Sequence, residues 1–199
     1  DATLDMRMNR EQKPSALTVL NEYNEEMLAE MFRNYGELEK SHRLAKAVIA
    51  FRSSQVLTTT EQLSGLVVQV YGQHNRNQQL AKVFQAIRIE VNAELEVLQD
   101  FLQTCLPALK PGGRLAVISY HSLEDRLVKN FLRSGTFQGN DESDVFGNRH
   151  RPFRLITKKA IAPSEQEIAK NPRSRSARLR IGEKADDHSG DRKSTRLNS

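Results

Sequence analysis

The chain is of moderate length, has a lean apolar composition and carries a moderate positive charge. Its 199 residues suffice for one good-sized domain or two small ones, and no run of about 18 apolar residues occurs, which argues against a membrane-spanning helix. A single cysteine, Cys105, excludes an internal disulfide and fits a reducing compartment, while the net charge of +5 favours a polyanionic partner without proving one.

The first part of the chain predicts helices alone. Ser15 and Asn24 can each cap a helix N-terminus, and a third helix has its apolar residues between positions 38 and 51. Thr58 and Thr59 each stand three residues before an acidic or amide side chain, which is the spacing of a capping box. We therefore expect a fourth helix to begin there.

The strongest periodicity in the chain follows a polar loop at residues 72–79. Apolar residues recur at steps of three or four and predict one long helix, whose last turn frays near Pro107. These residues are Phe84, Ile87, Val91, Leu95, Leu98, Leu102, Leu106 and Leu109. Gln85, Arg88 and Asn92 lie beside this apolar face, roughly on one polar stripe.

The segment from Lys110 to Arg126 combines a helix stop, a strand and a helix start. Pro111 and the two glycines after it end the preceding helix. Residues 115–118 are apolar without a polar break, which is typical of a strand covered on both faces by helices. Ser122, with the acidic residues that follow it, predicts the N-cap of the next helix.

The end of this strand is the first candidate for a functional site. In α/β sheets, ligands bind beyond the carboxyl ends of the strands, and Ser119, Tyr120 and His121 occupy that position. The histidines of the chain show no metal-ligand spacing, so we expect no metal site.

The rest of the chain adds two predicted strands. A helix that ends at Gly135 is followed by a polar loop to residue 150, and strands near residues 153–159 and 177–181 are suited to sheet edges. The strand near residue 115 needs a neighbour on each side. We therefore infer the C-terminal portion of a larger α/β domain into which a helical subdomain is inserted.

Several stretches, in the same order along residues 3–184, carry a resemblance to a known family. They are Leu4 to Met8, Asn34 to Glu37, Thr58 to Thr60, Phe84 to Ile89 with Asn92 and Glu94-Leu95, Ile118 to Arg126, Pro163 to Glu165 and Asn171 to Arg180. Together with the Lys-Pro-Gly-Gly turn before an apolar strand, they resemble the MraW (RsmH) family of class I methyltransferases. Members of this bacterial family act on N4 of a cytidine in small-subunit ribosomal RNA.

The resemblance implies an α/β fold, as a fragment of a class I (Rossmann-like) S-adenosylmethionine-dependent methyltransferase with an inserted all-helical subdomain. It assigns residues 1–14 to a loop from a missing N-terminal half, 15–110 to the inserted substrate-recognition domain, whose last helix leads back to the sheet, and 111–184 to the C-terminal strands and helices. Residues 185–199 do not match the family, and we expect an artefactual, disordered tail. The family's main cofactor-binding residues would precede Asp1, so none is assigned.

The same resemblance suggests which residues contact the target nucleotide. His121, Tyr120 and Ser119 are the candidates for positioning the base during catalysis. The candidates for substrate binding are Arg7, Gln85, Arg88, Asn92, Ser122, Arg126, Arg173 and Arg175. Structural alternatives stay open, because a histidine can fill a strand-to-helix corner, a serine can cap a helix, and arginines can be ordinary surface charge.

The family's activity implies a cytoplasmic enzyme that methylates 16S ribosomal RNA, free or in the ribosomal subunit, with S-adenosylmethionine as methyl donor. We expect this chain alone to be inactive, because the cofactor-binding loop is absent from it. Two other interpretations stay open: a non-catalytic RNA-binding module, and a module that forms a homodimer.

Overall fold

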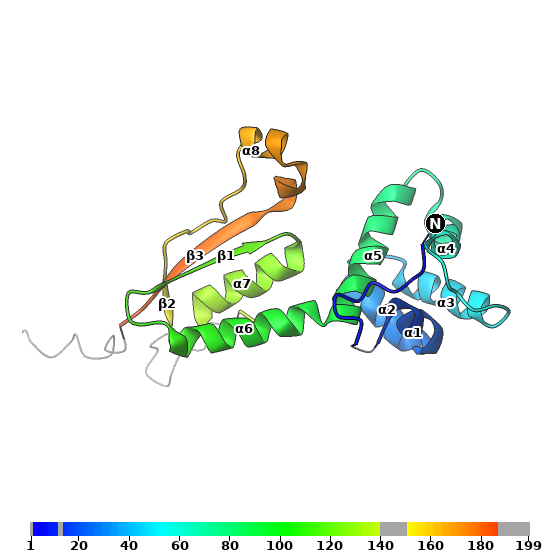
Figure 1. Ribbon diagram of the computed structural model, residues 1–199, viewed down its shortest axis with the longest axis horizontal. Helices are drawn as coiled ribbons and strands as arrows, with labels where there is room; N and C mark the ends of the chain where they lie inside the picture. The colour runs from blue at the N-terminus through cyan, green and yellow to red at the C-terminus, as the bar shows by residue number, and fades with distance from the viewer. Residues whose placement is uncertain (1, 12–13, 140–150, 187–199) are drawn as a thin grey trace, which may run out of the picture. The chain divides into compact units, whose positions relative to one another are not determined.

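A computed structural model describes residues 2–11, 14–139 and 151–186, and combines helices with a small antiparallel sheet (Figure 1). The chain divides into two compact units, Asp1–Glu94 and Leu95–Ser199. Each unit encloses its own hydrophobic core. None of the described helices is long and apolar enough to cross a membrane.

The first unit is helical, and its helix starts follow the capping residues of the sequence. Its elements are α1 (Ala16–Glu22), α2 (Glu25–Asn34), α3 (Ser41–Arg52), α4 (Thr60–Tyr71) and α5 (Arg76–Asn92). The side chains of Ser15, Asn24 and Thr59 accept hydrogen bonds from backbone N–H groups in the first turns of α1, α2 and α4. These predicted caps are confirmed, whereas the predicted loop at residues 72–79 is shorter, because α5 begins at Arg76.

The irregular segment before α1 is anchored in the core of the helical unit. Leu4 is fully buried among the apolar side chains of the helices. Its N–H donates to the Thr58 carbonyl over 3.0 Å, and its carbonyl accepts from the N–H of Leu17 over 3.0 Å. A polar segment is thus fixed through one apolar side chain and its own backbone groups.

Tyr23, between α1 and α2, gives the helical unit a contact that depends on pH. Its hydroxyl donates to Glu90 Oε1 over 2.7 Å, and burial together with this hydrogen bond raises the pKa of Tyr23 from 10.0 to about 12. The folded state therefore keeps a proton that the unfolded chain releases near pH 10.0. We expect this contribution to stability to be fully present below that pH and to be lost as the pH rises toward about 12.

Urea unfolding at a series of alkaline pH values checks this expectation. The Tyr23→Phe variant lacks the titrating hydroxyl, so its stability should fall less steeply across the same range. Equal slopes for the two proteins would mean that the Tyr23 hydroxyl is not coupled to folding.

The prediction of one long helix through residues 84–109 is wrong. Ala93 adopts the left-handed conformation, with φ of 47°, and separates α5 from α6 (Glu94–Ala108). The apolar stripe belongs to two cores, because Ile87 packs in the first and Leu102 in the second. Periodicity did not reveal the break, since a single left-handed residue leaves the steps of three and four unchanged.

The second unit packs helices against a three-stranded antiparallel sheet. Its further elements are β1 (Arg114–Ser119), α7 (Ser122–Ser134), β2 (Phe153–Leu155), α8 (Glu165–Lys170), a 3-10 helix (Pro172–Ser176) and β3 (Arg178–Lys184). The strand order is β1-β3-β2, so β3, which was predicted at an edge, lies at the centre, and β2 is shorter than predicted. Most of the predicted loop at 135–150 and of the predicted tail at 185–199 lies outside the described residues.

Strand β1 buries only one of its faces in this chain. Leu115 and Ser119 are buried, whereas Ile118 is 58% exposed, so the predicted cover on both faces is not found. The buried face packs with Leu102 of α6 and Phe131 of α7. One edge of β1 pairs with β3 along its whole length, and no other described strand pairs with the second edge.

Candidate functional site

The corner between β1 and α7 carries the three residues that were predicted to position a base. Ser119 is only 3% exposed, and its hydroxyl donates to the Arg178 carbonyl of β3 over 3.4 Å. Tyr120 is 54% exposed, whereas the side chain of the next residue, His121, is 8% exposed. Of the three side chains, Tyr120 is therefore the one that the corner presents to the surface of this unit.

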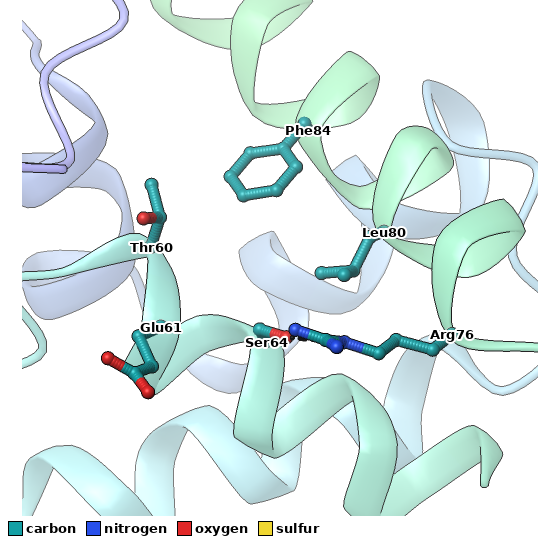
Figure 2. Close-up of a pocket in the computed structure, with 6 residues that line it drawn as sticks. All are labelled: Thr60, Glu61, Ser64, Arg76, Leu80 and Phe84. Carbon is teal, nitrogen blue, oxygen red and sulfur yellow. Dashed lines mark hydrogen bonds between the residues drawn. The ribbon is translucent and has the colours of Figure 1, made fainter. Parts of the chain in front are cut away.

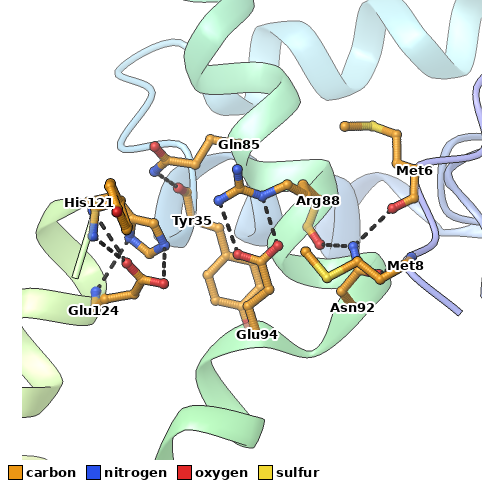
Figure 3. A network of polar contacts seen from close by, with 10 residues as sticks. Met6, Met8, Tyr35, Gln85, Arg88, Asn92, Glu94, His121 and Glu124 are labelled. Atoms are coloured by element: carbon orange, nitrogen blue, oxygen red, sulfur yellow. Dashed lines mark hydrogen bonds and ion pairs between the residues drawn. The ribbon is translucent and has the colours of Figure 1, made fainter. Parts of the chain in front are cut away.

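Glu124 fixes the conformation of this corner, and Figure 3 shows its carboxylate beside the His121 ring. Glu124 Oε2 accepts from the N–H of Tyr120 over 2.8 Å and from the N–H of His121 over 3.3 Å. Oε1 lies 3.4 Å from His121 Nε2. In return, His121 Nδ1 accepts from the N–H of Glu124 over 3.3 Å, which completes a capping box.

The N-cap of α7 is therefore His121, and the prediction that Ser122 caps this helix is wrong. Ser122 is the first residue of the helix and is exposed. Serine is a frequent cap, but the glutamate stands three residues after His121, and this spacing is the signal that could have found the true cap. Glu124 was absent from the predicted site residues, although it holds both Tyr120 and His121.

Asn92, the last residue of α5, holds the segment that contains Arg7 (Figure 3). Its Nδ2 donates to the Met6 carbonyl over 2.9 Å, and its Oδ1 accepts from the N–H of Met8 over 2.8 Å. These bonds bracket Arg7 and support Met6 at a φ of 62°, which is costly for a residue other than glycine. Arg7 makes two hydrogen bonds to the Asp5 carboxylate, of 2.6 and 3.0 Å, and this contact lowers the pKa of Asp5.

Gln85 and Arg88, the other members of the predicted polar stripe, also contact their own unit (Figure 3). Gln85 Nε2 donates to the Tyr35 carbonyl over 3.0 Å. The Arg88 guanidinium donates to both carboxylate oxygens of Glu94, over 2.7 and 3.1 Å. All three stripe residues thus have structural partners, and their contact with a substrate stays a prediction.

Replacing Asn92 with alanine is expected to loosen the segment at residues 2–11. The variant loses both hydrogen bonds that bracket Arg7, so we expect the helical unit to lose about 2 kcal/mol of stability. Hydrogen exchange measures the effect directly, since the Met8 N–H donates to Asn92 and should exchange much faster in the variant. Asn92→Asp is the matched control, because it retains the acceptor for Met8 and should preserve part of the protection.

The arginines of the second unit differ in exposure. Arg126, Arg173 and Arg175 are exposed. Arg180 instead donates to both carboxylate oxygens of Asp125 in α7, over 2.7 and 2.8 Å, and its side chain is 12% exposed. Arg180 therefore connects β3 to α7 and is not part of the exposed basic surface.

The candidate residues thus form three sets in the described structure. Ser119, Tyr120, His121, Ser122 and Arg126 lie at or next to the β1–α7 corner. Arg7, Gln85, Arg88 and Asn92 lie on α5 and on the segment before α1, and Arg173 and Arg175 lie on the 3-10 helix. Within the described residues, no strand is followed by a glycine-rich loop that could cradle a cofactor.

Comparison with known proteins shows the family of the chain. It belongs to the MraW methylase family, whose model matches residues 1–185. The family resemblance carried by the sequence motifs is thereby confirmed.

Several curated relatives of the chain are named ribosomal RNA small subunit methyltransferase H. The protein from Bacteroides thetaiotaomicron is 50% identical over 184 residues, which are 92% of this chain and 60% of the relative. The proteins from Parabacteroides distasonis and Flavobacterium johnsoniae are 48% and 47% identical over the same length, or 60% and 61% of those relatives. The chain therefore spans about 60% of the length of the curated relatives that it matches.

Proposed function

We propose that this chain is part of a cytoplasmic enzyme that transfers a methyl group from S-adenosylmethionine to N4 of a cytidine in 16S ribosomal RNA, free or within the small ribosomal subunit. The observation that carries the proposal is the match of residues 1–185 to a methylase family, together with relatives named for methylation of small-subunit ribosomal RNA. The corner between β1 and α7 supports it, since it presents an exposed tyrosine whose backbone N–H is bonded by the capping-box residue Glu124.

The fold proposed for the complete protein is a class I, Rossmann-like methyltransferase domain with a helical insertion. In this arrangement, residues 15–110 are the inserted substrate-recognition domain and residues 111–184 supply the last strands and helices. The second edge of β1, which no described strand pairs, supports this arrangement because an open edge favours pairing with a further strand.

The chain's own residues would act on the target base by positioning it. S-adenosylmethionine, when bound, supplies the electrophilic methyl group. The cytidine N4 amine is a weak nucleophile because its lone pair is delocalised into the ring, so orientation matters. We propose that the base leaves its stack and packs on the ring of Tyr120, while Glu124 and His121 hold the backbone of the corner in place.

A chimeric enzyme tests this function. Residues 1–185 replace the matching segment of the Bacteroides thetaiotaomicron relative, and mass spectrometry of 16S ribosomal RNA reads the modification. We expect N4-methylcytidine from the chimera and no methyl transfer from the 199-residue chain alone. A folded chimera that binds S-adenosylmethionine but leaves the RNA unmodified would contradict the proposal, and turnover by the chain alone would contradict its proposed inactivity.

Arg173 and Arg175 are proposed to contact the RNA backbone. The binding of their double alanine variant to a 16S ribosomal RNA fragment should depend less steeply on salt. The slope of log K against log salt concentration should decrease in magnitude by roughly 0.7 to 0.9 for each lost phosphate contact. A filter-binding series over salt concentration measures the slope. Arg43→Ala, which removes one exposed charge from α3 of the other unit, is the control, and equal slopes for the double variant and the unchanged chain would exclude these contacts.

A module without catalysis is the second candidate, and exposed apolar side chains on α6 favour it. Val97 and Phe101 are 60% and 51% exposed, and apolar side chains of this size on one helix suit an interface. If the chain is a homodimerisation module, sedimentation will find a stable dimer at micromolar concentration. If it is an RNA-binding module, RNA binding will persist in a chimera that fails to methylate.

A further inference from the structure

A pocket lies between α4 and α5 within the helical unit, and none of the candidate site residues named above lines it. It has a volume of about 410 Å³, which is within the range of small-molecule sites in proteins. Its lining residues are Thr60, Glu61 and Ser64 of α4 and Arg76, Leu80 and Phe84 of α5. Figure 2 shows the Phe84 ring and the Leu80 side chain on one side of the space, with Thr60 on the other.

The lining side chains of α5 follow one another along the helix axis. Arg76, Leu80 and Phe84 follow one another at steps of four residues, so they lie on one face of α5 over about 12 Å. A cation thus stands at one end of the wall and an aromatic ring at the other. A nucleotide has the same order of groups, with an anionic phosphate joined through its sugar to a flat base.

The Arg76 side chain is oriented by a buried partner. Its Nε donates to Ser64 Oγ over 3.1 Å, and Ser64 is only 7% exposed. Figure 2 shows the guanidinium reaching across the end of the pocket to this hydroxyl. Since one of the five N–H donors of the guanidinium is used in this bond, the group can hold its position and still donate to an anion.

The position of Arg76 on α5 favours an anionic ligand, although the Glu61 carboxylate of α4 also lines the pocket. Arg76 is the first residue of α5, where the helix dipole disfavours a positive charge. The first turn of α5 contains no acidic residue, and Asn75 makes no side-chain cap hydrogen bond there. An anion at this end would therefore interact favourably with both the guanidinium and the helix terminus.

We propose that this pocket binds one unpaired nucleotide of an RNA strand, with the phosphate at Arg76 and the base against Phe84. Aromatic side chains stack on bases in single-stranded RNA sites, and arginine donates two hydrogen bonds to a phosphate. Thr60 supplies a hydroxyl group on the α4 wall, opposite Phe84, that suits a polar group of the base edge. The proposal rests on the proposed function, since it gives the helical unit a second contact with the RNA substrate.

The test uses the 199-residue chain labelled with ¹⁵N and titrated with cytidine 5′-monophosphate. We expect chemical-shift changes concentrated on the amides of α4 and α5 that line the pocket. Arg76→Gln and Phe84→Leu should each weaken this binding about tenfold. Arg43→Gln, which removes a comparable exposed charge from α3, should leave it unchanged.

Separate titrations with inorganic phosphate and with cytidine test the two ends of the pocket independently. We expect Arg76→Gln alone to weaken the binding of phosphate, and Phe84→Leu alone to weaken the binding of cytidine. Phe84 also packs against the core of this unit, so the spectrum of each variant is first compared with that of the unchanged chain, and Arg76→Gln decides the outcome if Phe84→Leu unfolds. Shifts that scatter over the surface, or an affinity that neither variant changes, overturn the proposal.

The result of the nucleotide titration is independent of the result from the chimeric enzyme. A chimera that methylates 16S ribosomal RNA while the pocket binds no nucleotide would reject the second contact and leave the proposed function in place. A pocket that binds the nucleotide while the chimera stays inactive would support an RNA-binding unit and reject the enzyme.

Discussion

Replacing Asp125 with alanine is expected to destabilise the sheet-containing unit by about 3 kcal/mol. The Asp125 carboxylate accepts two hydrogen bonds from Arg180, and the side chains are only 23% and 12% exposed. Removing the carboxylate leaves a largely buried guanidinium without its partner, and such a group is far more costly than a lost surface ion pair. The contact also joins α7 to β3, the central strand, so the loss should spread through the sheet.

Hydrogen exchange is the suitable measurement, because each unit has its own core and can open separately. Amides of β3 and α7 should lose protection in Asp125→Ala, while amides of α2 and α4 keep theirs. Arg114→Ala is the matched control: it breaks an ion pair to Glu183 in the same sheet, but Arg114 is 65% exposed, so little change is expected. Similar effects of the two variants would refute the special role of the Asp125–Arg180 pair.

A second substitution, which removes the unpaired charge, tests whether that charge causes the loss of stability. In Asp125→Ala combined with Arg180→Met, the uncompensated charge is gone, and an apolar chain of similar length fills the space. We expect the double variant to recover part of the lost stability, since much of the loss in the single variant comes from the unpaired guanidinium.

Local chemistry made the starts of α1, α2 and α4 predictable from the sequence. Ser15, Asn24 and Thr59 each cap the helix that the sequence assigns to them, because the side chain and the N–H group that it accepts lie within three residues. The break at Ala93 was not predictable, because alanine is the best helix former and carries no signal of a left-handed residue.

The order of the strands could not be derived from the sequence for a related reason. The alternation of apolar and charged residues in β3 predicted a half-exposed edge strand, yet β3 lies between β1 and β2. Its charged positions are accommodated in the centre because Arg180 pairs with Asp125 and Glu183 accepts from both Arg114 and Arg154. These partners lie far apart in the chain, so no local sequence pattern predicts the pairs.

The candidate site, too, was predictable only where local sequence patterns determine it. The position of the β1–α7 corner followed from the buried strand and from the helix start, both of which are local patterns. The roles within the corner did not, because they depend on side-chain contacts. Glu124 holds the backbone of Tyr120, and Asn92 holds that of Met8. The sequence carries a signal only for the first of these residues, in the capping-box spacing of His121 and Glu124.

Replacing Tyr120 with alanine is expected to lower kcat/KM of the chimeric enzyme about 10- to 100-fold, on the proposed function. Tyr120 is 54% exposed at the end of β1, and the stacking of a base on an aromatic ring is worth about 1–3 kcal/mol. Tyr120→Phe retains the ring and should keep most of the activity. Steady-state kinetics on 16S ribosomal RNA, with calorimetry of S-adenosylmethionine binding as the control, separates loss of the base contact from loss of the cofactor.

Glu124 should act through Tyr120, and a double-mutant cycle shows whether it does. Glu124 Oε2 accepts from the Tyr120 N–H over 2.8 Å and does not need to touch the base. Glu124→Ala alone should therefore lower kcat/KM, but it should add little once Tyr120 is already alanine, because the ring that Glu124 positions is gone. Independent losses that multiply in the double variant would mean that Glu124 has a role of its own in the reaction. Unchanged activity in Tyr120→Ala would exclude stacking of the target base on the Tyr120 ring and leave Ser119, His121, Ser122 and Arg126 as the candidates of this corner.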